Sequence, residues 1–331
     1  MHLCLIMEEL SEIDRKVLYE LSRNSKQSYK QIARNIKSKK EVVAYHINEL
    51  LKRQIITKFV PIFSLSKLGI LSHKVYLKLQ GLTLEKEDKL IKDLIKDKKV
   101  AWIAKSIGRW DLLLGFYAKN IIEFAKIKDR ILSKLSKYVE EYNLTFIEDA
   151  IILNRDYLLN DKRKETSEFS FAGEFKIQRL DDLDLKIIQI IKNEARIPLL
   201  DIAKCLNVDA RTIKNRIREL EKRRILQGQT VFIDLDKLGF QLHKLCVTFK
   251  NYNSTDFERV VNYCKQNPKI IHIIKSLGSW ELELEIEDNN LQDIYDFIRL
   301  LKNEFAAIIK HIELVTIVKE PKLDFFPDFV D

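Results

Sequence analysis

The strongest constraint in this sequence is an internal repeat. Shifting the chain against itself by 170 residues aligns its two halves without gaps over about a hundred positions. The aligned pairs include Asp14 with Asp184, Glu49-Leu50 with Glu219-Leu220, and Gly108-x-Trp110 with Gly278-x-Trp280. Near the ends of the copies, Ile147-Glu148 aligns best with Ile312-Glu313, a shift of 165, so the second copy is expected to be slightly shorter. The chain should therefore fold as two copies of one structural unit.

Residues 154–179 separate the two copies and have the composition of a linker. They include the polar, unpatterned segment Asp161–Glu168. At about 3.3 Å per extended residue, a linker of this length spans several tens of ångströms. We therefore expect it to place no restriction on how the two copies meet.

Each copy opens with three short helical patterns. In the second copy, Asp181-x-x-Asp184 can cap the first helix, Pro198 opens the second, and Asp209 can cap a third that runs from 210 to about 224. The first copy repeats this plan with Ser11-x-x-Asp14, a second helix over 28–36, and Ser38-x-x-Glu41 as a capping box. The third helices carry the apolar stripes Val43, Ile47, Leu50 and Ile213, Ile217, Leu220. Three short helices with a tight turn before the third are typical of a helix-turn-helix domain.

The face of each third helix opposite its apolar stripe is the candidate nucleic-acid surface. In the second copy, this face and its flank carry Arg211, Lys214, Asn215, Arg218 and Lys222. The corresponding candidates in the first copy are Lys39, Lys40, Tyr45, Asn48 and Lys52, with Glu41 on the same face. Side chains of these types donate to phosphates and to base edges. The net charge of +9 permits such binding, but the placement of the charge is what favours it, and it favours the second copy.

The remainder of each copy is predicted to be α+β. Apolar runs at 55–63 and 225–233 are expected to form a wing or a connecting strand, and each copy then follows the ferredoxin-like order βαββαβ. One sheet face stays apolar enough to need a partner, as Trp102, Ile103 and Leu113 indicate. The predicted fold class is α+β, two winged helix-turn-helix domains and two ferredoxin-like domains in tandem, with these bounds: 8–63, 70–153, 180–234 and 240–320.

Several classes of protein are disfavoured by the residues present. The cysteines Cys4, Cys205, Cys246 and Cys264 form no C-x-x-C pair and no zinc-spaced cluster, so we expect reduced core thiols in a reducing cytoplasm and no metal. No apolar run reaches the roughly 18 residues of a membrane span. The segment Met1–Met7, with a second start candidate at its end, lacks the basic start and the cleavage site of a signal peptide. No nucleophilic triad and no phosphate-binding glycine loop is present, so neither an enzyme nor a cofactor is expected.

These residues resemble the Lrp/AsnC (feast/famine) family of bacterial and archaeal transcription regulators. The resemblance is strongest in the second copy, at Leu180-Asp-x-Leu-Asp184, Ala195-Arg196-Ile197, Ile202-Ala203, Thr212-Ile213-x-x-Arg216-Ile217-x-x-Leu220-Glu221, Ile225-Leu226-x-Gly228 and Leu238-Gly239. In the first copy, Lys26-Gln27 replaces Arg-Ile, and Gln54 stands near where a glycine is usual. Together the copies cover almost the whole chain outside the linker and the termini.

The resemblance implies a reader of double-stranded DNA joined to an α+β domain that dimerises sheet to sheet. It also implies an amino-acid effector near the Gly-x-Trp-Asp hairpin, with these candidate residues: Gly108, Trp110, Asp111, Gly278, Trp280 and Glu281. Glu281 departs from the usual aspartate and would place its charge differently. Alternatively, each hairpin is a tight turn between two strands with a packing tryptophan.

The tandem arrangement leads to a functional hypothesis. The two α+β domains are expected to pair within one chain as a pseudo-dimer, which is free to assemble further into a homo-oligomer. Because the two reading faces differ, the predicted function is a cytoplasmic, non-enzymatic transcription regulator that reads an asymmetric pair of half-sites. Two alternatives remain open. One is a siroheme-decarboxylase-like enzyme, which needs histidine and arginine clustered around a tetrapyrrole, and the other is an interaction protein with reduced DNA binding.

Overall fold

The computed structural model describes residues 9–159, 163 and 169–327, and the first copy begins with three helices in that range. They are α1 Glu12–Arg23, α2 Tyr29–Asn35 and α3 Lys40–Lys52. Ser11 caps α1 in a complete capping box with Asp14, as predicted. The predicted box at Ser38 and Glu41 is wrong, because α3 begins one residue later and its N-cap, Lys39, makes no side-chain capping bond.

The second helix-turn-helix domain repeats the first. Its helices are α6 Asp182–Ile191, α7 Leu199–Leu206 and α8 Ala210–Lys222. Asp181 accepts from the Asp184 N–H to cap α6, and Asp209 accepts from the Arg211 N–H to cap α8. Asn207 follows α7 in the left-handed conformation, which asparagine tolerates better than most residues. This residue makes the tight turn before α8.

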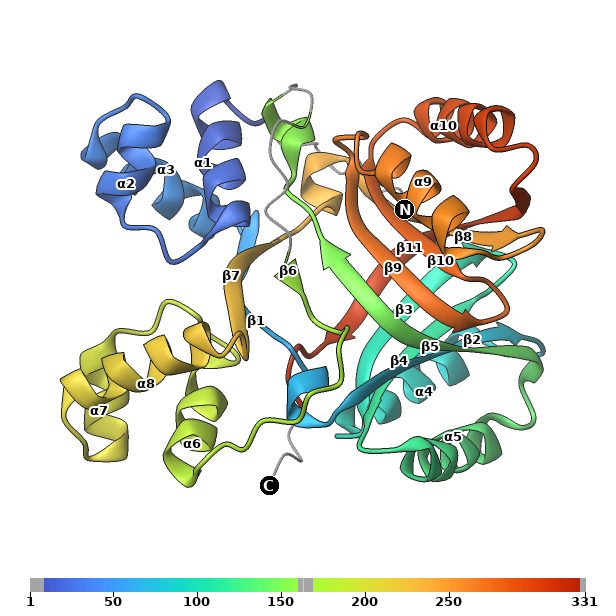
Figure 1. Cartoon of the computed structure of the whole chain (residues 1–331), viewed down its shortest axis with the longest axis horizontal. Coiled ribbons are helices and arrows are strands. Elements are labelled where there is room, and N and C mark those ends of the chain that lie inside the picture. The colour runs from blue at the N-terminus through green and yellow to red at the C-terminus, as the bar shows by residue number, and fades with distance from the viewer. Residues whose placement is uncertain (1–8, 160–162, 164–168, 328–331) are drawn as a thin grey trace.

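A two-stranded antiparallel ribbon connects the two domains to the rest of the molecule. It pairs β1 Ile56–Phe63 with β7 Leu226–Ile233, and Val60 lies opposite Thr230. These two residues are 170 positions apart, so each is the other's repeat equivalent and the ribbon is centred on the pseudo-two-fold axis. The predicted wing segments therefore pair with each other and hold the two domains at one end of the molecule (Figure 1).

At the other end, the strands of both copies close into one barrel. The first copy contributes β2 Leu71–Leu79, β3 Val100–Gly108, β4 Leu112–Ala118 and β5 Val139–Ile152. The second contributes β8 Gln241–Phe249, β9 Ile270–Gly278, β10 Leu282–Asp288 and β11 Ile309–Leu323. The strand order is β2-β4-β3-β11-β8-β10-β9-β5, and β5 also pairs with β2 to close the ring.

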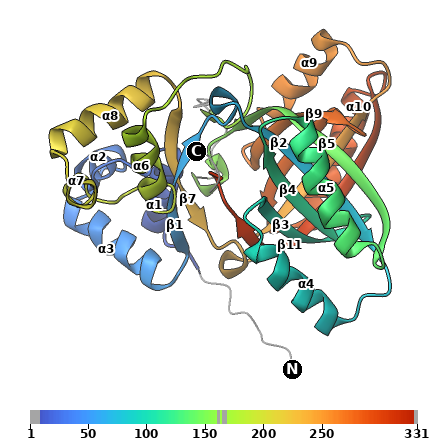
Figure 2. The same ribbon diagram turned by 90° about the horizontal axis from the view of Figure 1, so that it is seen from below.

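Helices cover the outside of this barrel, as Figure 2 shows. They are α4 Leu84–Lys96 and α5 Ile121–Leu135 on the first copy, and α9 Ser254–Cys264 and α10 Leu291–Glu304 on the second. Each pair buries an apolar cluster against its own sheet. The predicted α+β class with winged helix-turn-helix and βαββαβ units is confirmed.

The seams between the copies show that the repeat has no deletion. At one seam Thr145 of β5 lies opposite Gly278 of β9, and at the other Val315 of β11 lies opposite Gly108 of β3. Both members of each pair differ by 170 from their equivalents, so the shift of 165 predicted near the copy ends is wrong. Chance similarity between Ile147-Glu148 and Ile312-Glu313 misled the alignment, whereas hydrogen-bond register fixes the true equivalence.

The segment between the copies packs against the molecule instead of spanning freely. It includes the short helix η2 Asp156–Leu159 and the short strand β6 Phe169–Ser170, which pairs with β5. Tyr157 and Leu158 are buried, and Arg163 donates to Asp156 Oδ2 at 2.8 Å. The expectation that 154–179 leaves the copies unrestricted is therefore wrong where the structure describes it. Most of the polar segment 161–168 lies outside the described residues, as does Met1–Met7.

Two smaller expectations need correction. Trp102 and Leu113 do lie on the barrel interior, but Ile103 points to the helix-covered face, because neighbouring strand residues alternate between faces. Cys246 and Cys264 are buried as expected, but Cys205 is exposed on α7, and Cys4 lies outside the described residues. Among the described residues, no helix is long and apolar enough to cross a membrane, and no group of histidine, cysteine or acidic residues could hold a metal.

Candidate nucleic-acid interface and interior pocket

The third helices α3 and α8 present the sequence-predicted contact residues to solvent. All ten are exposed: Lys39, Lys40, Tyr45, Asn48, Lys52, Arg211, Lys214, Asn215, Arg218 and Lys222. The opposite faces are fixed by burial of the predicted apolar stripes, so the contact faces cannot rotate inward. Both helices lie in the two domains at the far end from the barrel (Figures 1 and 2).

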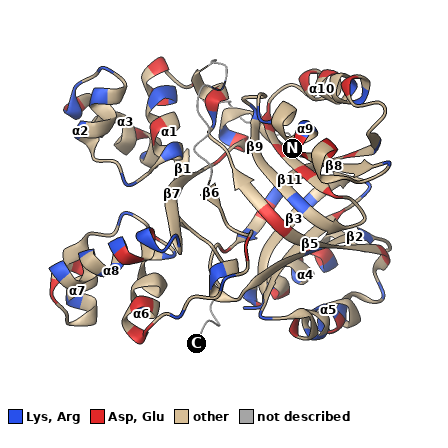
Figure 3. Cartoon of the chain, viewed as in Figure 1, with Lys and Arg blue, Asp and Glu red and all other residues tan. Residues whose placement is uncertain are grey.

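The two contact faces differ in charge. In α8, four basic residues lie on or beside the face, and Arg216 is withdrawn from it, because its guanidinium contacts Asp181 at 2.5 Å and Asp184 at 3.4 Å. In α3 the same face carries Glu41 and Tyr45, and Tyr45 is 62% exposed. In Figure 3 the positions of lysine and arginine along α8 are blue. The face of α8 is the more basic of the two.

Direct contacts hold the two helix-turn-helix domains in a fixed relation. Lys26 Nζ lies 2.5 Å from Glu221 Oε1 across the gap between the domains. The Arg196 guanidinium lies over the rings of Tyr29 and Phe59, at 5.1 and 5.0 Å from the ring centroids. Because these contacts add to the β1–β7 ribbon, the two contact faces form one two-part surface.

The predicted effector hairpins are closed by contacts within the chain. The buried Trp110 indole Nε1–H donates to Glu313 Oε1 at 2.5 Å, and the buried Trp280 indole Nε1–H donates to Glu283 Oε1 at 2.9 Å. Asp111 accepts from the Leu79 N–H at 2.7 Å, and its equivalent Glu281 accepts from the Phe249 N–H at 3.0 Å. These polar groups are therefore occupied in holding the hairpins to the barrel.

The glycines of the hairpins are required by the seams. Gly108 and Gly278 have φ angles of +122° and +150°, a backbone conformation that residues with a side chain rarely adopt. A Cβ atom on Gly278 would lie 2.4 Å from the Leu144 carbonyl oxygen, and one on Gly108 would lie 2.9 Å from the Leu314 carbonyl oxygen. The close approach of the two copies thus explains both glycines.

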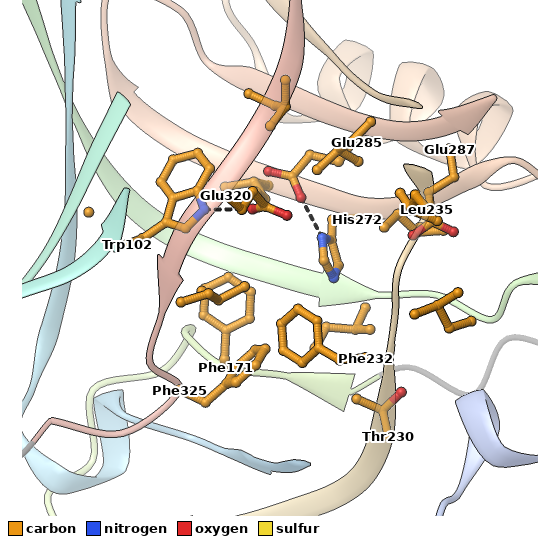
Figure 4. Close-up of a pocket in the computed structure, with 18 of the residues that line it drawn as sticks. Trp102, Phe171, Thr230, Phe232, Leu235, His272, Glu285, Glu287, Glu320 and Phe325 are labelled. Atoms are coloured by element: carbon orange, nitrogen blue, oxygen red, sulfur yellow. Dashed lines mark hydrogen bonds and ion pairs between the residues drawn. The ribbon is translucent and has the colours of Figure 1, made fainter. Parts of the chain in front are cut away.

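An interior pocket of about 390 Å³ lies between the barrel and the ribbon strand β7 (Figure 4). Its lining draws on both copies across the pseudo-two-fold axis. Equivalent pairs that line it include Trp102 with His272, Gly115 with Glu285, and Tyr117 with Glu287. The effector-hairpin residues do not line it. The pocket was not foreseen from the sequence, because its residues come from segments distant along the chain.

The strand β10 supplies three acidic groups of the interior. Glu283, Glu285 and Glu287 alternate along β10 and point into the barrel, while Leu282, Leu284 and Ile286 pack under the helices. Glu287 receives two hydrogen bonds from Arg155, at 2.8 and 2.9 Å. The sequence signal for these residues was the alternation over 281–287, which is typical of a strand with one polar face.

A buried ion network lies inside the barrel beside the pocket, and Lys74 and Glu285 belong to both. Lys74 and Lys244 are repeat equivalents, and both contact Glu283 Oε2, at 2.7 and 2.9 Å. Lys244 also contacts Glu285 at 2.5 Å. Burial by itself would raise the pKa of Glu283, but the charges of Lys244 and Lys74 outweigh it and lower this pKa to about 2. The two lysines and two glutamates thus form a charge-balanced set.

The pocket wall also holds charge that is not balanced. Glu320 accepts from the Trp102 indole Nε1–H at 2.7 Å, and the residue as a whole is exposed. Desolvation of the carboxyl and the charge of Glu285 raise its pKa, against the opposing hydrogen bond from Trp102 and the opposing charges of His272 and Lys244. Burial and the neighbouring Asp234 also raise the pKa of Asp236. Within the described part of the chain, no side-chain nitrogen of a lysine, arginine or histidine lies within 4.0 Å of these three carboxylates: Asp234, Asp236 and Glu320.

Comparison with known proteins agrees with the presence of two helix-turn-helix domains. Residues 180–221 match the family described as AsnC-type helix-turn-helix domain, and residues 10–57 match that described as winged helix-turn-helix DNA-binding. The HTH-type transcriptional regulator FL11 of Pyrococcus horikoshii is 26% identical over 122 residues, which are 37% of this chain and 80% of that protein. The HTH-type transcriptional regulator LrpC of Bacillus subtilis is 25% identical over 134 residues, which are 40% of this chain and 91% of LrpC.

Over its whole length, the chain has the fold of a different kind of protein. The crystal structure of the siroheme decarboxylase NirDL superposes with a TM-score of 0.63 and covers 96% of this chain and 94% of NirDL. The two sequences are 14% identical, so the likeness concerns the fold. It establishes that the arrangement of both copies around one barrel occurs in a solved structure.

Proposed function

Because the chain is related to the Lrp/AsnC transcription regulators and carries two helix-turn-helix domains, we propose that it binds double-stranded DNA and regulates transcription. The single observation that carries this proposal is the exposed basic face of α8, on the third helix of a domain that matches the AsnC type. In the proposed complex, lysine and arginine contact phosphates, and Arg211, Asn215 and Arg218 read base edges in the major groove.

The two copies act in this proposal as an intramolecular pseudo-dimer. Its support is the pairing of β3 with β11 and of β5 with β9, together with the ribbon centred on Val60 and Thr230. Two readers related by a two-fold axis favour half-sites about one helical turn apart or a multiple of it. Since α3 and α8 expose different side chains, the preferred operator is asymmetric, with the stronger half-site under α8.

The first test compares charge removal on and off the proposed surface. A fluorescence-anisotropy titration uses DNA selected from a random pool and compares Arg211→Ala/Arg218→Ala/Lys222→Ala with the parent. The matched control is Lys86→Ala/Lys89→Ala/Lys92→Ala, which removes three exposed positive charges from α4 on the barrel. We expect the α8 variant to bind at least tenfold more weakly, and each lost phosphate contact to reduce the slope of log K against log salt by about 1.

Three outcomes separate the competing explanations. Equal loss in the α8 and α4 variants would mean that only net charge matters, and unchanged binding in the α8 variant would place the DNA on another surface. No binding by the parent protein would favour an interaction protein. A third variant, Lys39→Ala/Lys40→Ala/Lys52→Ala, measures how much α3 contributes to DNA affinity. We expect this variant to lose less affinity than the α8 variant.

Small-molecule control and assembly are tested by two further measurements. Repeating it with and without a pool of amino acids tests the effector that the resemblance implies at the two hairpins. Light scattering tests whether the chain is a monomeric pseudo-dimer or assembles further. An obligate dimer in which β3 pairs with its own counterpart in another chain would contradict the intramolecular pairing.

A second candidate function is an enzyme that acts on a tetrapyrrole, as NirDL does by its name. One observation favours it, namely the fold shared over 96% of the chain, together with an interior pocket. His73, His272 and Arg155 line the pocket, as this alternative requires, but Arg155 is already paired with Glu287. The carboxylates Asp234, Asp236 and Glu320 would in addition meet the carboxylates of a siroheme. A siroheme titration followed by absorbance tests this alternative, and tight binding with loss of carbon dioxide would establish it over the regulator.

A further inference from the structure

The interior pocket is polarised across the pseudo-two-fold axis. In a dimer of identical subunits, positions related by the two-fold axis would carry the same residue. Here the first copy supplies Trp102, Gly115 and Tyr117, and the second supplies His272, Glu285 and Glu287 at the equivalent positions. Duplication within one chain has allowed one wall to become aromatic and the other acidic.

Aromatic side chains extend the apolar part of the wall. Phe171 comes from the segment between the copies, Phe232 from β7, and Phe325 from the end of the chain beyond β11. Figure 4 shows these rings below Trp102 and Glu320, facing the open volume. Flat rings at several angles around a volume of about 390 Å³ suit a ligand with a flat apolar body.

The charges that face the pocket do not cancel. Arg155 matches the charge of Glu287 at 2.8 Å, and Lys244 matches the charge of Glu285 at 2.5 Å. The Nδ1 atom of His272 also lies 2.5 Å from Glu285 Oε2. Lys74 is already bound to Glu283, which leaves Lys319 as the remaining basic side chain of the wall. Against Lys319 stand three carboxylates that have no cationic side chain within 4.0 Å among the residues that the structure describes, namely Asp234, Asp236 and Glu320. The charge of Lys319 acts on Asp236 from a longer distance.

We propose that this pocket binds a flat organic cation whose positive group lies at Glu320 and whose apolar body lies among the aromatic rings. The cation would supply the counter-charge that Glu320 lacks, and the rings would interact favourably with its positive charge. An anionic ligand of the same shape would instead meet carboxylates that outnumber the basic side chains left on the wall, and like-charge repulsion would disfavour it.

The pocket also touches the part of the chain that leads to the DNA surface. Thr230, Val231 and Phe232 of β7 form one wall, and β7 begins four residues after α8 ends. Occupancy would therefore bear directly on the strand that supports the more basic contact face. This regulatory consequence rests on the proposed DNA binding, whereas ligand binding does not, so the two are measured separately.

The test uses two probes with the same ring system and opposite charge, 9-aminoacridine as the cation and acridine-9-carboxylate as the anion. Each is titrated into the full chain without DNA by isothermal calorimetry. We expect the cation to bind at least tenfold more tightly than the anion. Glu320→Gln keeps an acceptor for the Trp102 indole. This variant should bind the cation at least fivefold more weakly and should bind the anion equally well or more tightly.

Further variants control for folding and for surface binding. Asp236→Asn repeats the charge test at a second wall position, Glu258→Gln removes an exposed carboxylate on α9 as the matched control, and Leu235→Trp fills the pocket. The site is supported if the filled variant no longer binds either probe while the control variant binds both as the parent does. Three results overturn it: equal or tighter binding of the anion, unchanged cation binding in both charge variants, or no binding of either probe.

The regulatory consequence is then read from DNA binding. The anisotropy titration is repeated with 9-aminoacridine, and the filled variant is measured at the same dye concentration as the control for dye that binds the DNA directly. A change in DNA affinity that disappears in the filled variant supports coupling through β7. If the cation binds but DNA affinity does not change, coupling is refuted while the ligand site stands.

Discussion

Replacing Glu283 with leucine, the residue that the first copy carries at position 113, should destabilise the barrel strongly. The Glu283 side chain is fully buried, and its carboxylate contacts Lys74 Nζ at 2.7 Å and Lys244 Nζ at 2.9 Å. It also accepts hydrogen bonds from Tyr76 and Trp280, both at 2.9 Å. The substitution therefore leaves an excess buried positive charge and two unpaired donors. Removing one partner of a buried ion pair costs about 3–5 kcal/mol.

The size of the effect can be checked by thermal and urea unfolding followed by circular dichroism. For a chain of 331 residues that unfolds as one unit, that loss corresponds to a fall in Tm of about 4–7 °C. The milder variant Glu283→Gln keeps an acceptor for Tyr76 and Trp280 and should lose less. If the leucine variant does not fold, the glutamine variant still measures the charge contribution.

Double variants test the charge balance more sharply than the single change. Adding Lys74→Met to Glu283→Leu leaves Lys244 paired with Glu285 at 2.5 Å, so much of the loss should be recovered. Adding Lys244→Met instead leaves Lys74, whose Nζ lies 3.9 Å from Glu285, and the recovery should be smaller. A leucine variant that loses less than about 1 kcal/mol, or a double variant no more stable than the single, would refute this account.

The pH dependence gives a check with a defined sign. The pKa of Glu283 is lowered to about 2 in the folded chain, below the ordinary value of 4.5. The stability contributed by its ionised form is therefore present above pH 4.5 and is lost as the pH falls from 4.5 toward 2. Glu283→Gln should flatten that part of the stability profile. An equally steep acid loss in the variant would assign it to other carboxylates.

The remaining predictions concern single residues. His73 is buried and has no hydrogen-bond partner among the described residues. Burial lowers its pKa from 6.5 to about 4, so stability should fall as the pH drops through this range. His73→Phe should flatten that fall in urea titrations at pH 7 and pH 5, and a profile like the parent's would contradict it. Gly278→Ala should lower the free energy of unfolding by at least about 2 kcal/mol, because the new Cβ meets backbone at a strained φ. Gly228→Ala should cost less, because its new Cβ meets the movable Phe169 ring, and equal losses would argue against the backbone clash.

Much of the fold was predictable because local patterns and the repeat both pointed the same way. The caps at Ser11, Asp181 and Asp209 form as the residue types indicate. The exposed faces of α3 and α8 follow from helical periodicity once the apolar stripes are known. Burial of those stripes depends on neighbours within the same domain, so a sequence window contains most of the information.

The interior site was not predictable for a physical reason that β10 illustrates. Alternating charged and apolar residues over 281–287 are typical of a strand with one face in water. In this chain the charged face is enclosed, because β10 lies within a closed barrel and Lys74 approaches Glu283 from 209 positions away. The pattern indicates that one face of the strand is polar, but it does not indicate whether another strand covers that face.

The sequence by itself determined that there are two copies, which elements each contains, and which helix faces are basic. Those properties depend on side-chain periodicity and on a repeat that is visible at one fixed shift. Only the tertiary structure decided that the copies share one barrel without a deletion, that the connecting segment packs down, and that Trp102 and His272 face one pocket. The reason is that strand pairing across the two seams joins residues distant along the chain, and their register is set by backbone hydrogen bonds that no local pattern specifies.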